Sequence, residues 1–304
     1  MERFFIIDGM AIAYRAYFAF INRPLINAKG MNTSAVFGFV NTLEKILGDE
    51  KPEHVAVAFD TAQPTFRHER YPEYKATREK MPDDMVDQLP YLKKIVQAYN
   101  IPLLELPGWE ADDIIGTLAR RAEQEDLECF LVTPDKDFMQ LVTERVKIFR
   151  PGKATDSYDI IDLDGVREKF GVTPAQVIDV LGLMGDQSDN IPGVKGIGEK
   201  TAIPLIQKFG SIPDLYARLE EVEKKGVRSK LEGQRDEAFL SRDLVTIDTD
   251  APVEVDPQDL RFSEKDREAL RALFEELEMR RFIERLDADE DGTAVAGAGR
   301  ASMD

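Results

Sequence analysis

Three short apolar runs, each followed by an aspartate, constrain the fold of this chain more than any other sequence feature. The runs and their aspartates are 4–7 with Asp8, 54–59 with Asp60, and 129–133 with Pro134 and Asp135. Runs this short and this continuously apolar are typical of buried strands in a parallel sheet. The segments between them carry helical patterns at 35–47, 87–99 and 111–125, and 146–149 indicates one more strand. We therefore predict an α/β fold in which helices flank a doubly wound, mostly parallel central sheet.

The pattern changes near residue 163, where short helical segments separated by glycine and proline begin. Thr173 and Pro174 form an N-cap and N1 pair that opens a helix reaching Met184. Apolar positions repeat at helical spacing through 266–286, which predicts one amphipathic helix docked on the body. We expect an α/β core at 1–162, a helical region at 163–286 and a flexible acidic, Gly/Ala-containing tail at 287–304.

Composition excludes several classes of protein. Among the 304 residues no apolar window is long enough to cross a membrane, and the first residues lack the apolar core and cleavage site of a signal peptide, so we expect a cytoplasmic protein. The one cysteine, Cys129, lies in an apolar run and is expected to be a buried, inert thiol. With only two histidines a zinc site is not expected.

The net charge of −18 argues at first sight against a nucleic-acid partner. The average hides two local basic islands, however. Residues 61–80 carry five basic side chains against three acidic ones, and residues 224–235 carry five against one. A nucleic-acid partner therefore remains compatible with the sequence.

Nine carboxylates stand where predicted strands end or helices begin. They are Asp8, Asp60, Glu110, Asp112, Asp113, Asp135, Asp137, Asp186 and Asp189. The carboxyl ends of parallel strands meet at one crevice, where unpaired carboxylates repel one another and need cations. Oxygen ligands alone favour Mg²⁺ or Mn²⁺, and two such ions about 4 Å apart are the arrangement that cleaves phosphodiesters. The alternative is a scatter of solvated acids, since a single aspartate after a strand is usually a cap or turn residue.

A glycine-rich segment at 185–202 supplies a second motif. Gly193, Gly196 and Gly198 indicate a tight hairpin between two helices, with Lys195, Lys200 and Thr201 beside it. Free amides at the start of the second helix can hold a phosphate, and the hairpin carbonyls can also seat a monovalent cation. A dinucleotide-binding loop is the alternative, but no strand precedes these glycines, so we favour a helix-hairpin-helix that binds DNA backbone.

Aromatic and basic residues are interleaved in two places directly after predicted strands. One is the stretch Arg67, Arg70, Tyr74, Lys75 and Arg78, in which Lys75 and Arg78 would share a helix face and meet a phosphate in the crevice. The other is Tyr14, Arg15 and Tyr17, which could stack against a terminal base pair. A solvated surface helix is the plain alternative for the first stretch.

These residues together resemble the flap endonuclease (5′ nuclease) family, and most closely the 5′-3′ exonuclease domain at the amino end of bacterial DNA polymerases I. The resemblance covers residues 3–286 and rests on these motifs: Asp8-Gly9, Tyr14-Arg15, Phe59-Asp60, Tyr74-Lys75 with Arg78, Met81-Pro82, Glu110 to Asp113, Thr133 to Asp137, Gly185 to Asn190 and 193–202. One departure is Phe18, where relatives often have histidine. Phenylalanine can still stack on a base.

The resemblance implies a PIN-like nuclease core, a helical arch over 64–90, a helix-three-turn-helix that often binds K⁺, and a two-metal nuclease acting on DNA and RNA primers. The expected partners are nicked or branched duplex DNA with a 5′ flap and RNA primer-DNA, with no membrane. The ending resembles a junction into a proofreading and polymerase part, so we expect an excised domain that is a monomer near the nucleoid. A stand-alone 5′ nuclease, a PIN-like ribonuclease and a non-catalytic binder of DNA structures stay open.

Within that scheme the carboxylates divide between two metals. Asp60, Glu110 and Asp112 would serve one, and Asp135, Asp137 and Asp189 the other. Asp8, Asp113 and Asp186 would act through water molecules. Lys75 and Arg78 would stabilise charge on the scissile phosphate, while Tyr14, Arg15 and Tyr74 would guide the unpaired 5′ end.

Overall fold

A six-stranded sheet with the order β3-β2-β1-β4-β5-β6 forms the centre of the molecule, which is described here from a computed structural model. The structure describes residues 1–152 and 158–290. Neighbouring strands run parallel except β5 and β6, which are antiparallel. The strands are β1 (Arg3–Asp8), β2 (His54–Ala58), β3 (Leu103–Leu104), β4 (Glu128–Val132), β5 (Val146–Pro151) and β6 (Tyr158–Ile161).

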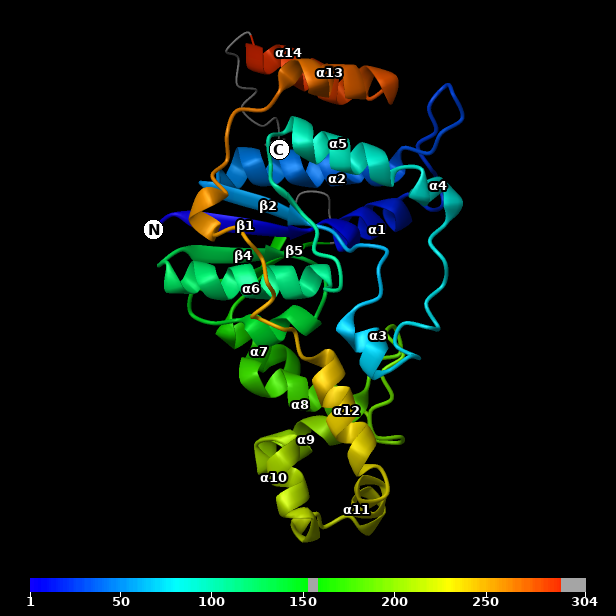
Figure 1. Cartoon of the computed structure of the whole chain (residues 1–304), viewed down its shortest axis with the longest axis vertical. Helices are drawn as coiled ribbons and strands as arrows, with labels where there is room; N and C mark the ends of the chain where they lie inside the picture. The colour runs from blue at the N-terminus through cyan, green and yellow to red at the C-terminus, as the bar shows by residue number, and fades with distance from the viewer. Residues whose placement is uncertain (153–157, 291–304) are drawn as a thin grey trace, which may run out of the picture.

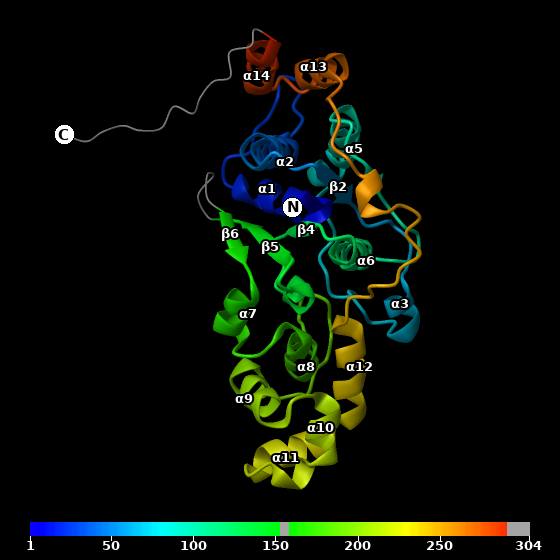
Figure 2. The same ribbon diagram turned by 90° about the vertical axis from the view of Figure 1, so that its left-hand side faces the viewer.

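Helices cover both faces of the sheet, as Figures 1 and 2 show. Phe5 and Ile7 face the side covered by α1 (Gly9–Ala19), α2 (Ser34–Lys45), α5 (Leu89–Ala98), α13 (Arg267–Glu276) and α14 (Arg280–Glu290). Phe4 and Ile6 face the opposite side, where α6 (Ala111–Gln124) packs. Successive side chains of a strand point to opposite faces of the sheet, and here apolar residues point both ways. Both faces of the sheet are therefore buried under helices.

The core on the α6 side continues into a helical region that lies at the far end of the molecule from α13 and α14 (Figures 1 and 2). Its helices are α7 (Leu163–Phe170), α8 (Pro174–Met184), α9 (Glu199–Phe209), α10 (Ile212–Ala217), α11 (Lys225–Glu232) and α12 (Arg235–Val245). The remaining elements are α3 (Phe66–Arg70), α4 (Asp83–Val86), the π-helical turn η1 (Ile46–Glu50), and the 3-10 turns η2 (Asp137–Leu141), η3 (Leu219–Glu221) and η4 (Pro257–Asp259).

The predicted sheet is confirmed. Strands occur at all four predicted places, and the expected helix at Thr173 begins with a capping box in which Thr173 and Gln176 bond reciprocally. The short β3 and the antiparallel β6 were not predicted. Cys129 is fully buried, as expected. Within the described residues, none of the helices is both long enough and apolar enough to span a lipid bilayer.

The helix predicted over 266–286 is interrupted in the structure. The single helix expected over 266–286 is two helices, α13 and α14, because Glu278 adopts a left-handed conformation with φ of 59° that breaks the helix. The flexible tail was expected to begin at 287, but residues 287–290 continue α14, and 291–304 lie outside the described residues.

Lys75 and Arg78 also do not share a helix face. Helix α3 ends at Arg70, the following residues form turns, and Lys75 has φ of 57°. The segment 64–90, expected to be an arch, therefore contains the short helices α3 and α4 joined by turns; α3 lies beside α12, and α4 lies well above it at the right of Figure 1.

Candidate active site

The first acidic residue of the cluster is fixed where β1 becomes α1. Asp8 is the N-cap of α1, and its Oδ1 accepts a hydrogen bond from the Ala11 amide at 2.9 Å. Its Oδ2 accepts one from the Thr133 hydroxyl at 3.1 Å, which ties β1 to the end of β4. Gly9 allows this close turn, because a Cβ there would lie 2.6 Å from the Phe59 ring. Asp8 is only 6 % exposed.

The second and third acidic groups meet at the start of α6. Oδ1 of Asp60, just beyond β2, accepts a hydrogen bond from the Ala111 amide at 2.8 Å. Glu110 is the buried N-cap of α6, and Asp112 lies in its first turn. Helix starts favour negative charge because their amides are unpaired and the helix dipole is positive there.

The remaining acidic groups come from the loops after β4 and α8. The Asp137 amide donates to Oδ1 of Asp135 at 2.9 Å, and the Ser188 amide donates to Oδ1 of Asp186 at 2.7 Å. Among the described residues, the buried Oδ1 of Asp137 finds no hydrogen-bond partner. A buried carboxylate oxygen without a donor is costly unless a cation or water meets it.

Several of these carboxylates lose hydration and repel one another. Loss of hydration, strengthened by Asp60 and Asp135, raises the pKa of Asp8 to about 7. Loss of hydration together with Asp8, Asp135 and Glu110 raises the pKa of Asp112 well above its ordinary value, and loss of hydration with Asp135 does the same for Asp137. Asp186 and Asp189 add to the repulsion at Asp137. The crevice therefore carries a surplus of negative charge that favours cations.

Two predicted cations enter this crevice. The Lys75 ammonium lies 2.6 Å from Oε1 of Glu110, and Arg78 lies 2.5 Å from Oδ1 of Asp189. Loss of hydration alone would lower the pKa of Lys75, but Glu110 and Asp189 raise it, so the side chain stays charged. Both predicted catalytic cations thus contact residues predicted to bind metal.

A third cation was missed in the sequence. The Lys136 ammonium lies 3.0 Å from Oδ2 of Asp186. Loss of hydration alone would raise the pKa of Asp186, but the charge and hydrogen bond of Lys136 lower it below its ordinary value. Thr133, which donates to Asp8, was missed too. Lys136 and Thr133 both belong to the Thr133 to Asp137 motif, and this position could have identified them from the sequence.

Asp113 and Arg67 form a buried ion pair beside Glu110, in which Nη1 of Arg67 also lies 3.3 Å from Oε2 of Glu110. Arg67 is 2 % exposed, so it has no surface to offer DNA, and its two terminal nitrogens bond to the two carboxylate oxygens of Asp113 at 2.7 and 2.8 Å. The amides of Glu110 and Asp248 donate to Asp113 as well. Protein donors thus occupy the Asp113 carboxylate, which acts as a structural anchor for α3 on α6.

Two tyrosines are also corrected. Tyr74 is 4 % exposed and donates toward Glu110 and Asp189 at 3.0 and 3.1 Å, so it positions these carboxylates and cannot stack on a DNA base. Tyr17 is 5 % exposed, and its hydroxyl donates to Asp84 at 2.8 Å. Neither side chain is free to guide a DNA end.

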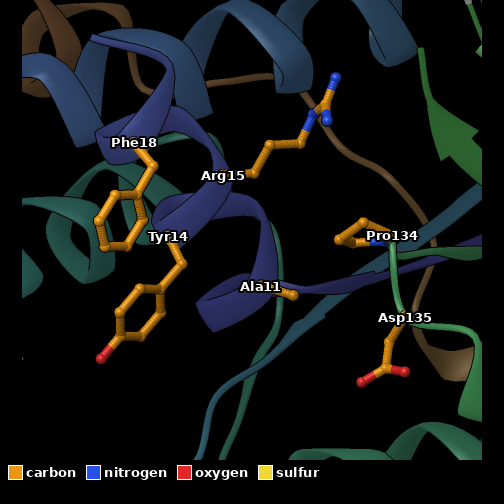
Figure 3. A pocket seen from close by; sticks show the side chains of 6 residues that line it. All are labelled: Ala11, Tyr14, Arg15, Phe18, Pro134 and Asp135. Atoms are coloured by element: carbon orange, nitrogen blue, oxygen red, sulfur yellow. The ribbon is translucent and has the colours of Figure 1, made fainter. Parts of the chain in front are cut away.

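Tyr14, Arg15 and Asp135 do line one pocket of about 420 Å³ together with Ala11, Phe18 and Pro134 (Figure 3). The rings of Tyr14 and Phe18 lie side by side, with centroids 6.2 Å apart and planes 13° apart. Phe18 is 52 % exposed, and Arg15 bonds to the Gly152 carbonyl. Arg70, half exposed, pairs with Asp243 on α12, away from the acidic cluster.

The predicted hairpin lies between α8 and α9. Gly193 has φ of 58° and packs so closely that a Cβ there would lie 2.4 Å from the Gly185 amide, which requires glycine. Gly198 is the N-cap of α9, and Lys200 and Thr201 are in its first turn. Lys195, Gly196, Gly198 and Lys200 are exposed, so this surface is open to a ligand.

No three acidic, histidine or cysteine side chains of residues 1–152 and 158–290 converge, as they stand, on one metal-binding point. Lys75, Arg78 and Lys136 neutralise part of the cluster instead. The all-oxygen donor set, the unpartnered Oδ1 of Asp137 and the raised carboxyl pKa values fit hard divalent cations such as Mg²⁺ or Mn²⁺.

Comparison with known families agrees with the motifs. Residues 3–171 match the family described as 5'-3' exonuclease, N-terminal resolvase-like domain, and residues 172–268 match 5'-3' exonuclease, C-terminal SAM fold. The chain therefore belongs to the 5'-3' exonuclease family.

Its curated relatives include DNA polymerases I. That of Bacillus caldotenax is 44% identical over 288 residues, which are 94% of this chain and 32% of the relative. That of Bacillus subtilis is 44% identical over 289 residues, covering 95% of this chain and 32% of the relative. The chain thus spans about a third of the length of the relatives it matches.

Solved structures share the fold at lower identity. T5 5'-exonuclease with bound zinc gives a TM-score of 0.66 at 23% identity, covering 94% of this chain and 98% of that one. The catalytic core of Rad2 in complex with DNA substrate gives 0.59 at 18% identity, covering 91% and 88%. The α/β fold with a PIN-like core and a helical region, predicted from the sequence, is thereby confirmed, and the family models describe these parts as a resolvase-like domain and a SAM fold.

Proposed function

We propose that this chain is a structure-selective 5′-3′ exonuclease and 5′ flap endonuclease that hydrolyses phosphodiesters of DNA and RNA primers. The observation that carries the proposal is the acidic crevice at the carboxyl ends of β1, β2 and β4, with Lys75 and Arg78 inside it, in a chain of the 5'-3' exonuclease family. Structural anchors alone would not gather so many carboxylates that raise one another's pKa values.

Two Mg²⁺ or Mn²⁺ ions are the proposed cofactors. Asp60, Glu110 and Asp112 would hold one and Asp135, Asp137 and Asp189 the other, with Asp8 and Asp186 acting through water. Asp113 is left out because Arg67 holds it. Bound there, the ions would supply an acidified water as nucleophile and neutralise the phosphate.

The chain's own residues supply the remaining chemistry. Lys75 and Arg78 now contact carboxylates that would hold metal, so metal binding would free both cations to meet the scissile phosphate. Tyr74, with its hydroxyl between Glu110 and Asp189, fixes their orientation. Tyr14, Arg15 and Phe18 line a pocket that reaches Asp135 and would receive the 5′ end of the strand.

Duplex DNA would lie along the hairpin at 193–198, bound through its backbone by Lys195, Gly196, Gly198, Lys200 and Thr201. With this role, the chain would act in primer removal and repair at the nucleoid, in the cytoplasm, as a monomeric domain joined to a polymerase part. The share of the relatives that the chain covers supports the last point.

A flap duplex labelled at its 5′ end, incubated with Mg²⁺ with and without EDTA, tests the proposal. We expect cleavage near the junction in Mg²⁺ only, leaving a 5′-phosphate and a 3′-hydroxyl. Equal or faster cleavage of linear single-stranded RNA would instead identify a ribonuclease, and tight flap binding without cleavage in any divalent metal would identify a non-catalytic binder.

A further inference from the structure

Side chains of α11, of α12 and of the turn between them hold the backbone of the 193–198 hairpin. The Gly193 amide donates to Oγ of Ser241 at 2.9 Å, and the Lys195 amide donates to Oε1 of Gln234 at 2.8 Å. The Lys230 ammonium donates to the Gly196 carbonyl at 3.0 Å. The hairpin is thus fastened to the helical pair that follows it.

Most of the hairpin carbonyls already accept hydrogen bonds from protein donors. Val194 O accepts from the Ile197 amide at 2.9 Å, and Gly198 O accepts from Thr201 at 2.8 Å. Lys195 O accepts from Gln234 at 3.4 Å. A K⁺ ion needs several carbonyl oxygens turned toward it to replace its hydration shell. Because each carbonyl oxygen has two lone pairs, a K⁺ ion at this hairpin would have to share these oxygens with the protein donors that they already accept from.

The end of the Lys230 side chain lies against Gly196. Gly196 has φ of 86°, and a Cβ there would lie 2.6 Å from Nζ and 3.1 Å from Cε of Lys230. The left-handed φ favours glycine at this position, and with any other residue the end of the Lys230 side chain would have to move. An ammonium group has three donors, and Lys230 is exposed, so donors remain for a ligand at the surface.

We propose that Lys230 is the built-in cation of this hairpin: its ammonium group occupies the place of a bound K⁺ at the Gly196 carbonyl and donates at the same time to a phosphate of duplex DNA. The inference rests on the proposed function, which supplies duplex DNA as the ligand. It assigns a role to a residue of the basic island at 224–235 and predicts that duplex binding does not depend on K⁺.

The test is fluorescence anisotropy of a labelled nicked duplex in Ca²⁺, at one ionic strength supplied by potassium, sodium or tetramethylammonium chloride. The proteins are the wild type, Lys230→Met, Lys230→Arg and Lys225→Met, the last removing an exposed lysine from the same helix. We expect wild-type affinity to vary less than about twofold among the salts. Lys230→Met should bind about tenfold more weakly in tetramethylammonium, with most of that loss restored by K⁺.

Lys230→Arg should behave like the wild type, and Lys225→Met should lose about twofold equally in every salt. K⁺-dependent binding by the wild type would overturn the inference and leave the proposed function intact. So would a Lys230→Met loss no larger than that of Lys225→Met, or one that K⁺ does not restore. No duplex binding by the wild type in any salt would overturn both.

Discussion

The ammonium group of Lys75 lies 2.6 Å from Oε1 of Glu110, and the Lys75 backbone reaches this position in a left-handed conformation with φ of 57°. Its amide donates to the Asp189 carbonyl at 2.9 Å, which fixes the turn against the loop after α8. A non-glycine residue in this conformation is uncommon and is often found where side-chain placement matters. The turn places the Lys75 ammonium against Glu110, within the acidic cluster.

Lys75→Ala should lower the single-turnover rate of flap cleavage by about a hundredfold or more, since a cation facing growing charge contributes roughly 2 to 4 kcal/mol. Substrate affinity in Ca²⁺ should change far less. The matched control is Lys93→Ala, which removes a lysine paired with Glu105 at the same 2.6 Å but outside the crevice. A loss confined to binding, or equal rates for both variants, would contradict the assignment.

Asp113→Ala should destabilise the fold, because it removes the carboxylate that bonds to both terminal nitrogens of the buried Arg67 guanidinium. Breaking a buried pair in this way costs about 3 to 5 kcal/mol. Urea unfolding measures the effect, with Asp243→Ala as control, because its pair with Arg70 is partly exposed and contributes about 1 kcal/mol or less. Unchanged stability of Asp113→Ala would show that Asp113 is not an anchor.

Asp8→Asn should stabilise the metal-free protein, and more so as pH rises. The pKa of Asp8 is raised from 3.8 to about 7 in the folded state, so the folded state binds more protons than the unfolded state. Its ionisation therefore removes stability as pH rises from about 4 to about 7. Asparagine keeps the N-cap and removes the charge.

Urea unfolding in EDTA at pH 5 and pH 8 measures this difference. We expect the gain from Asp8→Asn to be about 1 to 3 kcal/mol larger at pH 8, since one pKa unit corresponds to about 1.4 kcal/mol. A gain that is the same at both pH values would mean that Asp8 is not held in a repulsive, desolvated site.

Gly198→Val should weaken duplex binding by about tenfold, to the same degree for unrelated DNA sequences, because it obstructs backbone contact at the start of α9. A Cβ at Gly198 meets nothing within 4 Å, so the fold should survive. Gly48→Val is the control, since its Cβ is equally unhindered and lies in η1, outside the hairpin. Sequence-dependent losses in anisotropy titrations would contradict backbone binding.

The sheet and the acidic crevice were predictable because both follow from local pattern. Apolar runs such as 4–7 define buried strands, and parallel strands bring the residues after them to one edge. Asp8 and Asp60 therefore meet although they lie far apart in the sequence. The caps of α6 and α8 were equally local signals.

Other relationships depend on tertiary contacts that leave no local signal. Arg67 stands in a charged stretch typical of a surface, yet it is buried against Asp113, 46 residues away. The break between α13 and α14 has neither glycine nor proline. Glu278 at this break accepts a hydrogen bond at 2.8 Å from the Ala28 amide, which lies 250 residues away in the sequence. Such partners become visible only in the folded chain.

The central claim is that the acidic crevice holds the divalent metals that drive cleavage, and Asp137→Asn tests it most directly. Its buried Oδ1 has no protein partner among the described residues, so the substitution removes a proposed ligand and disturbs little else. The control is Asp164→Asn, at an aspartate that is 89% exposed.

The measurement is single-turnover cleavage of a 5′-labelled flap duplex in saturating Mg²⁺, with binding followed in Ca²⁺. We predict that Asp137→Asn lowers the rate by about two orders of magnitude or more, that it still binds the flap, and that the control cleaves like the wild type. Near-wild-type cleavage by Asp137→Asn, or cleavage by the wild type that persists in EDTA, would contradict the account.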